Sequence, residues 1–457
     1  MEHMGIISVI PALSVIALAI ITRRTFEPLL FGSLIGFVLL DGFGFFPAWL
    51  DAIYIVMMDD VTVWVVLVCG LFGSLIALLE KSGGAKGFSI AATNVVKGRG
   101  TSLIGTWILG MLIFVDDYLN ALSVGVAMRK VTDNFKVPRE LLAYVINSTG
   151  AVVCVIVPFS TWSAFMAGQL GANGVLVDGS ATAAFIRTIP YVFYGWAALL
   201  VVPLVALKVI PTFGPMRKAE LRAEAGELFP PGVRDKVKEE SLSEAAEEDG
   251  EKKPQILDFI VPMLILAAVT IITEDMLWGV LIAITSCLAL YISRKVMNFS
   301  QFWDSFMEGF QNMIPALAIV CAAFFLQQAN EGLGLTAFVI ESVEPFMTGG
   351  LLPAVTFIVV ALIAFSTGSF WGVAAISLPI IIPLAGVYGV NVFLASGAVI
   401  SAAAFGSHAC FYGDAATLTC ASTQIPNIEY AKTTLPMLII PAGLAILLYL
   451  IVGFATI

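Results

Sequence analysis

The sequence predicts an all-α polytopic membrane protein, and three observations support this. Of the 457 residues, 59% are apolar and only 12% are charged, about half the charged share of a soluble domain. The mean hydropathy is +0.97, and apolar runs long enough to cross a bilayer recur along most of the chain. These runs are continuous, whereas the strands of a membrane β-barrel would alternate apolar and polar residues.

The first half contains five predicted spans and one interrupted apolar run. The interrupted run, 101–128, carries Asp116 and Asp117 at its centre and has basic residues at both ends. Each arm would form roughly 18–24 Å of helix, which is too short for a hydrocarbon core of about 30 Å. We therefore expect a re-entrant hairpin between the third and fourth of the spans 5–22, 28–47, 60–79, 140–167 and 184–207.

The second half repeats this plan. Its interrupted run, 351–386, is broken at STGS (366–369), and segment 361–378 resembles segment 111–128. An odd number of crossings in each half gives the halves opposite orientations, and inverted repeats with broken helices are typical of secondary transporters. The sequence thus predicts inverted repeats at 1–209 and 255–457, joined by a linker at 210–254, with second-half spans 255–273, 276–293, 309–328, 391–419 and 434–456.

The distribution of basic residues predicts the topology. With both termini outside, all of the 23 lysines and arginines except Arg187 fall on the cytoplasmic side, as the positive-inside rule requires. The linker 210–254 then lies in the cytoplasm, and its acidic stretch 216–254 is expected to be solvated and partly disordered. Nothing in the charge pattern indicates nucleic-acid binding. The six cysteines lie in apolar segments and are expected to be free thiols.

Two adjacent acids in a membrane segment need neutralising partners, because one charge at the bilayer centre costs about 2.5–3.5 kcal/mol or more. Carboxylates beside the free carbonyls of a hairpin tip are hard oxygen ligands for Na⁺, and protonation of the same carboxylates is the competing state. Asp116 and Asp117 are therefore the predicted Na⁺ and proton site. The alternative is that one of the two only caps the helix that follows.

Two further spans are expected to be broken. In 147–162, Pro158 removes a backbone donor, so helix continuity should fail near 158–161. In 405–423, His408 and Asp414 lie within an apolar run, and an intramembrane acid is a functional candidate by default. A hydroxyl in such a helix can instead bond to its own turn, and His408 can be a packing residue, so both readings stay open.

These observations give two sets of candidate residues. The STGS tip carries no formal charge, so it could bind either a cation or the anionic part of a substrate. The predicted ion or proton ligands are Asp116, Asp117, Asn120, Asn147, Ser148 and Thr149. The predicted substrate-binding residues are Ser160, Thr161, Trp162, Ser366, Thr367, Gly368, Ser369, Ser407, His408 and Asp414.

The segments FVDDYLNALSVG, MRKVTDNFKVPRELLAYVINSTGAVVCVIVPFSTW, STGSFWGVAAISLPI and GSHACFYGDAATL resemble the NhaC family of bacterial Na⁺/H⁺ antiporters. The resemblance implies a scaffold with a mobile transport domain, a homodimer and a place in the bacterial inner membrane. It also implies that a carboxylate is usual where this chain has Asn147. Because related members exchange malate for lactate, the resemblance does not fix the substrate.

The sequence supports Na⁺/H⁺ antiport by alternating access as the first hypothesis, with Na⁺ as transported ion and no cofactor. In it, Asp116 and Asp117 bind Na⁺ or a proton, Asn120 and the hydroxyls complete the shell, and His408 and Asp414 tune it. The alternative is Na⁺-coupled transport of a small organic solute, such as a carboxylate or an amino acid, on the same fold. An intramembrane enzyme is disfavoured, since no nucleophile–base pair or zinc-protease motif occurs in the sequence.

Overall fold

The regular elements of the protein are helices, seen in a computed structural model that describes residues 3–22, 24–114, 117–158, 160–230, 255–273, 275–343, 348–368 and 370–456. Within these residues, seven helical stretches are long and apolar enough to cross a membrane. The number is eight if Ala181–Tyr191 and Phe193–Ala206, which meet at 52°, form one bent span. The all-α prediction is confirmed.

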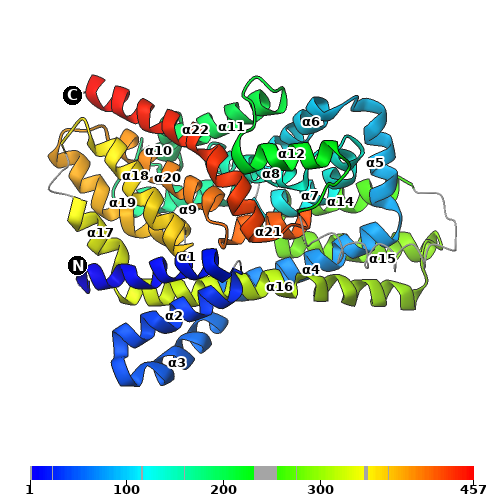
Figure 1. Ribbon diagram of the computed structural model, residues 1–457, viewed down its shortest axis with the longest axis horizontal. Coiled ribbons are helices and arrows are strands. Elements are labelled where there is room, and N and C mark those ends of the chain that lie inside the picture. The colour runs from blue at the N-terminus through cyan, green and yellow to red at the C-terminus, as the bar shows by residue number, and fades with distance from the viewer. Residues whose placement is uncertain are drawn as a thin grey trace.

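One layer of the molecule, here called the α16 layer, is built around two long helices (Figure 1). Helix α16 packs along α4 and α2, and α15 packs on both α4 and α14. The layer comprises α1 (Ile10–Thr22), α2 (Phe26–Asp41), α3 (Phe45–Met58), α4 (Asp60–Lys81), α14 (Leu257–Thr273), α15 (Met276–Ser293) and α16 (Phe299–Gly332).

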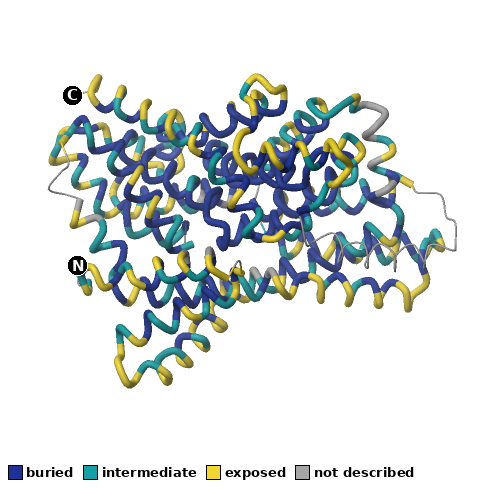
Figure 2. Tube along the Cα trace, viewed as in Figure 1, coloured by how far each residue is buried: buried dark blue, intermediate teal, exposed yellow. Residues whose placement is uncertain are grey.

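The second layer, here called the core layer, holds most of the buried residues (Figure 2). Helices α5 (Gly84–Val95) and α17 (Leu335–Val343) pack against members of both layers. The core layer comprises α6 (Arg99–Leu112), α7 (Asp117–Asn134), α8 (Arg139–Val153), α9 (Thr161–Ala172), α10 (Ala181–Thr188), α11 (Phe193–Ala206), α12 (Gly214–Glu224), α18 (Leu352–Thr367), α19 (Phe370–Val387), α20 (Val392–Ala409), α21 (Asp414–Thr423) and α22 (Asn427–Ala455).

Helix ends interrupt the core layer where the apolar runs of the sequence are interrupted. Helix α6 ends at Leu112, and α7 begins five residues later at Asp117. Helix α18 ends at Thr367 and is capped by Gly368, whose φ of +67° is the left-handed conformation that glycine adopts without strain. The break predicted near 158–161 is confirmed, since α8 ends at Val153 and α9 begins at Thr161. A further break separates α20 from α21.

Helix α3 departs from the predicted span at 28–47. Helix α2 ends at Asp41, and Gly42, with φ of +57°, lets the chain turn. The indole nitrogen of Trp49 then donates to the Ser33 hydroxyl at 3.2 Å, a contact that a continuous helix could not make, because 16 residues of helix span about 24 Å. Helix α3 therefore folds back along α2.

Helix α12 lies in the linker that composition predicts to be solvated. Its residues Met216 and Ala219 are buried, and the helix packs on α8 and α22. Two ion pairs hold α12 in place. In the first, Arg99 of α6 pairs with Glu220 of α12, and in the second, Arg222 of α12 pairs with Glu140 of α8 at 2.7 Å. The first part of the linker is thus part of the folded core, while residues 231–254 lie outside the described residues.

Candidate ion site between the broken helices

Helices α7 and α21 run parallel with their N-terminal ends side by side. Tyr118, in the first turn of α7, donates its hydroxyl hydrogen to Oδ2 of Asp414, the first residue of α21. Further along, the Ser422 hydroxyl of α21 donates to the Ala121 carbonyl at 2.7 Å. A Cβ on Gly125 would lie 2.1 Å from the Ser422 Oγ, so the bare glycine allows this close approach.

Two carboxylates occupy these paired helix ends. Asp117 is the first residue of α7 and is 2% exposed, and Asp414 is 6% exposed. The Ala415 backbone N–H donates to Oδ1 of Asp414 at 2.7 Å. The N-terminus of a helix carries partial positive charge, which stabilises a carboxylate placed there. Acids from the two halves of the chain are therefore buried at helix ends that Tyr118 joins.

Asn120 bonds across the break between α6 and α7 through its amide nitrogen, and its amide oxygen points elsewhere. Its Nδ2 donates to the carbonyls of Gly110 at 2.5 Å and Ile113 at 2.8 Å, at the end of α6. Because carbonyls only accept, these two bonds fix the orientation of the amide. Its Oδ1 then faces Gly150 of α8, where an added Cβ would lie 3.2 Å away. This buried oxygen has no hydrogen-bond partner among the described residues.

Tyr412 reaches the second break from the turn between α20 and α21. Its hydroxyl lies 3.0 Å from the Phe365 carbonyl and 2.9 Å from the Ser366 carbonyl, in the last turn of α18. A Cβ on Gly368 would lie 3.1 Å from the Tyr412 ring. Tyr412 and Asp414 belong to the same turn. This turn therefore contacts both helix breaks: Tyr118, after the break between α6 and α7, bonds to Asp414, and Tyr412 bonds to the end of α18, before the break between α18 and α19.

His408 lies at the centre of a second buried network. Its Nε2 is 2.9 Å from the Ser148 hydroxyl and its Nδ1 is 2.9 Å from the Tyr194 hydroxyl. Asn147 donates to the Tyr430 hydroxyl at 2.7 Å and to the His408 carbonyl at 3.2 Å. Both ring nitrogens of the histidine are therefore occupied, and the network joins α8 and α11 to α20 and α22.

Several candidate residues make local contacts. Ser160 caps α9 by accepting from the Ser163 backbone N–H at 3.0 Å. Trp162 stacks on Trp371 with ring centroids 4.4 Å apart. Hydroxyls that donate to carbonyls of their own helix, within 2.7–3.2 Å, belong to Thr149, Ser366 and Thr367. The Ser407 hydroxyl is buried without a partner among the described residues.

Some predicted residues cannot be placed, and some important ones were not predicted. Asp116, Ser369 and the side chain of Thr161 lie outside the described residues. The tyrosines that connect the candidate residues, Tyr118, Tyr194, Tyr412 and Tyr430, were not among the candidates. Their signal in the sequence was weak: Tyr118 directly follows the acidic pair and Tyr412 stands two residues before Asp414, but nothing local says which groups they contact.

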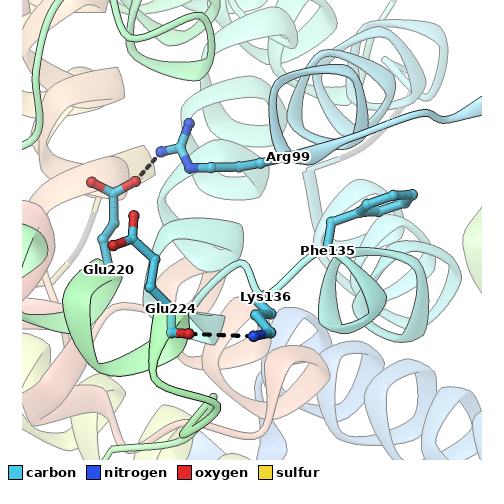
Figure 3. A pocket seen from close by; sticks show the side chains of 5 residues that line it. All are labelled: Arg99, Phe135, Lys136, Glu220 and Glu224. Atoms are coloured by element: carbon cyan, nitrogen blue, oxygen red, sulfur yellow. Dashed lines mark hydrogen bonds and ion pairs between the residues drawn. The ribbon is translucent and has the colours of Figure 1, made fainter.

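A surface pocket of about 240 Å³ lies elsewhere, beside α12 (Figure 3). It is lined by Arg99, Phe135, Lys136, Glu220 and Glu224. Arg99 pairs with Glu220, and the Lys136 ammonium lies 3.4 Å from the Glu224 carbonyl oxygen. These charges hold the linker helix in place and do not belong to the site at the helix breaks.

Comparison with known proteins identifies the family. Residues 175–454 match the Na⁺/H⁺ antiporter family. The chain belongs to the Na⁺/H⁺ antiporter family. An uncharacterized protein of Haemophilus influenzae is 27% identical over 487 aligned residues, covering 98% of this chain and 91% of the relative.

Membership of the Na⁺/H⁺ antiporter family makes the protein a multi-pass membrane transporter and not an enzyme, and Na⁺ and H⁺ are the ions of the family. The matched residues include Asp414, Tyr412 and the break after α18. Asp117 and Asn120 lie before them, in the half of the chain whose resemblance rests on the motifs quoted above.

Proposed function

We propose that this member of the Na⁺/H⁺ antiporter family exchanges Na⁺ for H⁺ by alternating access, at a site formed by Asp117 and Asp414. One observation carries the proposal: the two buried carboxylates lie at the adjacent N-terminal ends of parallel helices, with Tyr118 bonded to Asp414. Asp116, which adjoins Asp117 in the sequence, belongs to the same proposed site.

Exchange follows from the cost of burying charge. A buried carboxylate is stabilised when its charge is neutralised, and either a sodium ion or a proton can do this. Both bind to carboxylate oxygens, and in this proposal they compete for the oxygens of Asp117 and Asp414. Only one of them occupies the site at a time, so the binding of one ion releases the other.

Asn120 completes the proposed shell with a neutral oxygen. Its Oδ1 is buried and held in a fixed direction by the two bonds that its amide nitrogen makes. An amide oxygen is a suitable ligand for a hard cation and does not titrate. In this proposal Asn147, Ser148 and His408 support the site, because their polar atoms bond to one another and to Tyr194 and Tyr430.

The packing of the helices supports the inverted-repeat arrangement. Helix α6 packs on α7 and α8, as α18 packs on α19 and α20, and α11 packs on α6 and α8, as α22 packs on α18 and α20. We propose that residues 1–209 and 255–457 form the two repeats and that the pairs α6–α7 and α18–α19 are the re-entrant hairpins. The core layer would then move relative to the α16 layer, with both termini outside and the linker in the cytoplasm.

Exchange can be tested in proteoliposomes that enclose a pH-sensitive dye. An external Na⁺ pulse should make the lumen alkaline as Na⁺ enters and protons leave, and a choline pulse should not. Asp117→Asn and Asp414→Asn should each reduce this rate strongly, because an amide cannot exchange a proton. Asp51→Asn, on the exposed face of α3, is the matched control and should keep the rate.

A wild-type protein with no Na⁺-dependent pH change would contradict the proposal. A response that appears only with an added carboxylate or amino acid would favour solute transport.

A further inference from the structure

We propose that Tyr412 is a positioning residue that holds the second helix break against Asp414 and thereby sets the affinity of the site for Na⁺. This inference rests on the proposed Na⁺/H⁺ exchange. Tyr412 does not itself contact the ion in this account. It acts through the position of the turn 410–414, to which Asp414 belongs.

The hydroxyl of Tyr412 bonds to main-chain carbonyls at the C-terminal end of α18, where the helix provides no N–H donors. The last carbonyls of a helix have no intrahelical N–H partner, and a buried one must find a donor elsewhere. At the end of α18, the Gly368 N–H takes the Ala364 carbonyl. The Tyr412 hydroxyl lies 3.0 Å from the next carbonyl, of Phe365, and 2.9 Å from that of Ser366. The break and the turn are thus bound together.

The turn 410–414 also packs against the start of α19, on the other side of the break. A Cβ on Gly413 would lie 2.6 Å from the ring of Phe370, the first residue of α19, so the bare glycine lets that ring pack directly on the turn. Tyr412 and Gly413 therefore contact the end of α18 and the start of α19, and the next residue is Asp414. A shift of the break moves the carboxylate that Tyr118 binds from the other half of the chain.

The test compares Tyr412→Phe with Tyr449→Phe. Tyr449 is equally buried, and its hydroxyl likewise lies within reach of two main-chain carbonyls, those of Tyr191 at 2.7 Å and Gly397 at 2.9 Å, but it lies away from the breaks. Its hydroxyl also lies 2.6 Å from the Ser401 hydroxyl, so Tyr449→Phe should lose at least as much thermal stability as Tyr412→Phe. Tyr412→Phe alone should raise the Na⁺ concentration for half-maximal exchange about tenfold, the effect of one such hydrogen bond, while the maximal rate stays within about twofold.

A second pair of variants tests the contact if Tyr412→Phe does not fold. Gly368→Ala adds a Cβ 3.1 Å from the Tyr412 ring at φ +67°, whereas Gly389→Ala adds one at φ +68° with nothing within 4 Å. The backbone strain is matched, so only Gly368→Ala should raise the half-maximal Na⁺ concentration.

Equal Na⁺ dependence within each pair would overturn the role of Tyr412 while leaving the exchange intact. A wild-type protein that exchanges no protons for Na⁺ would instead remove the proposed function itself, so the two failures are distinguishable.

Discussion

Tyr118 and Asp414 are 296 residues apart in the chain, yet the hydroxyl of the first donates to the carboxylate of the second inside the core layer. Each residue stands at the N-terminal end of a helix that begins after a break. The bond therefore joins the two halves of the chain at the helix ends that carry the buried carboxylates Asp117 and Asp414.

Tyr118→Phe should weaken Na⁺ binding. The variant removes a hydrogen bond to a charged group, worth about 1.5–3 kcal/mol, so the half-maximal Na⁺ concentration for exchange should rise roughly tenfold or more. Tyr291→Phe is the control, because the Tyr291 hydroxyl donates to the Asp258 carbonyl at 2.6 Å within the α16 layer. If both variants show wild-type Na⁺ dependence, the Tyr118–Asp414 bond has no part in ion binding.

Asn120→Ala should destabilise the protein by about 1–3 kcal/mol, because the carbonyls of Gly110 and Ile113 would lose their donor in a buried place. Unfolding by steric trapping in bicelles measures the change. Asn173→Ala is the control: its amide also donates to a carbonyl, that of Gln169 at 2.8 Å, but at a partly buried helix end. If Asn120→Ala loses no more stability than Asn173→Ala, the bonds from the Asn120 amide to the end of α6 do not stabilise the break.

Gly125→Ala should cost about 3 kcal/mol of stability, because overpacking forces apart helices that already touch. The new Cβ would lie 2.1 Å from the Oγ of Ser422 and 2.4 Å from its Cβ. Adding Ser422→Gly removes both atoms and should restore most of the loss. Gly168→Ala, with nothing within 4 Å of the added Cβ, should be neutral. Absence of rescue in the double variant would refute the close parallel packing of α7 and α21.

Arg129→Gln should loosen the contact between the two layers. Arg129 of α7 is 4% exposed and pairs with Glu80 at the end of α4. Removing one partner of a buried pair costs about 3–5 kcal/mol, and we expect about 2 kcal/mol here because a quarter of the Glu80 side chain is exposed. The exchanged pair Glu80→Arg with Arg129→Glu should recover part of the stability. Lys432→Gln, in an exposed pair with Glu429, should have little effect.

The sequence predicts the helices and most of their interruptions well, because these follow from local chemistry. Continuous apolar runs form the helices, and α8 ends at Val153, before Pro158, whose missing donor would interrupt a continuing helix. Helix α12 was not predicted, because its charged composition resembles that of a solvated linker. The spacing of Met216, Ala219 and Ala223 marks an apolar stripe, and this signal could have revealed it.

The candidate site is only partly predictable for a different reason. A carboxylate in an apolar run stands out, as Asp117 and Asp414 do, because its burial has a known cost. A tyrosine in such a run is unremarkable, and its importance depends on the partner that the fold brings to its hydroxyl. The contacts of Tyr118 with Asp414 and of Tyr412 with the end of α18 span 296 and 46–47 residues of sequence, so no local pattern could indicate them.

The central claim is that Na⁺ and protons compete for the same carboxylates, and the pH dependence of Na⁺ affinity tests it most directly. In proteoliposomes, the half-maximal Na⁺ concentration should rise about tenfold for each unit by which pH falls once the site is protonated, with the maximal rate reached at high Na⁺ unchanged. Asp414→Asn should flatten this dependence. A half-maximal Na⁺ concentration that is the same at all pH values in the wild-type protein would contradict the account.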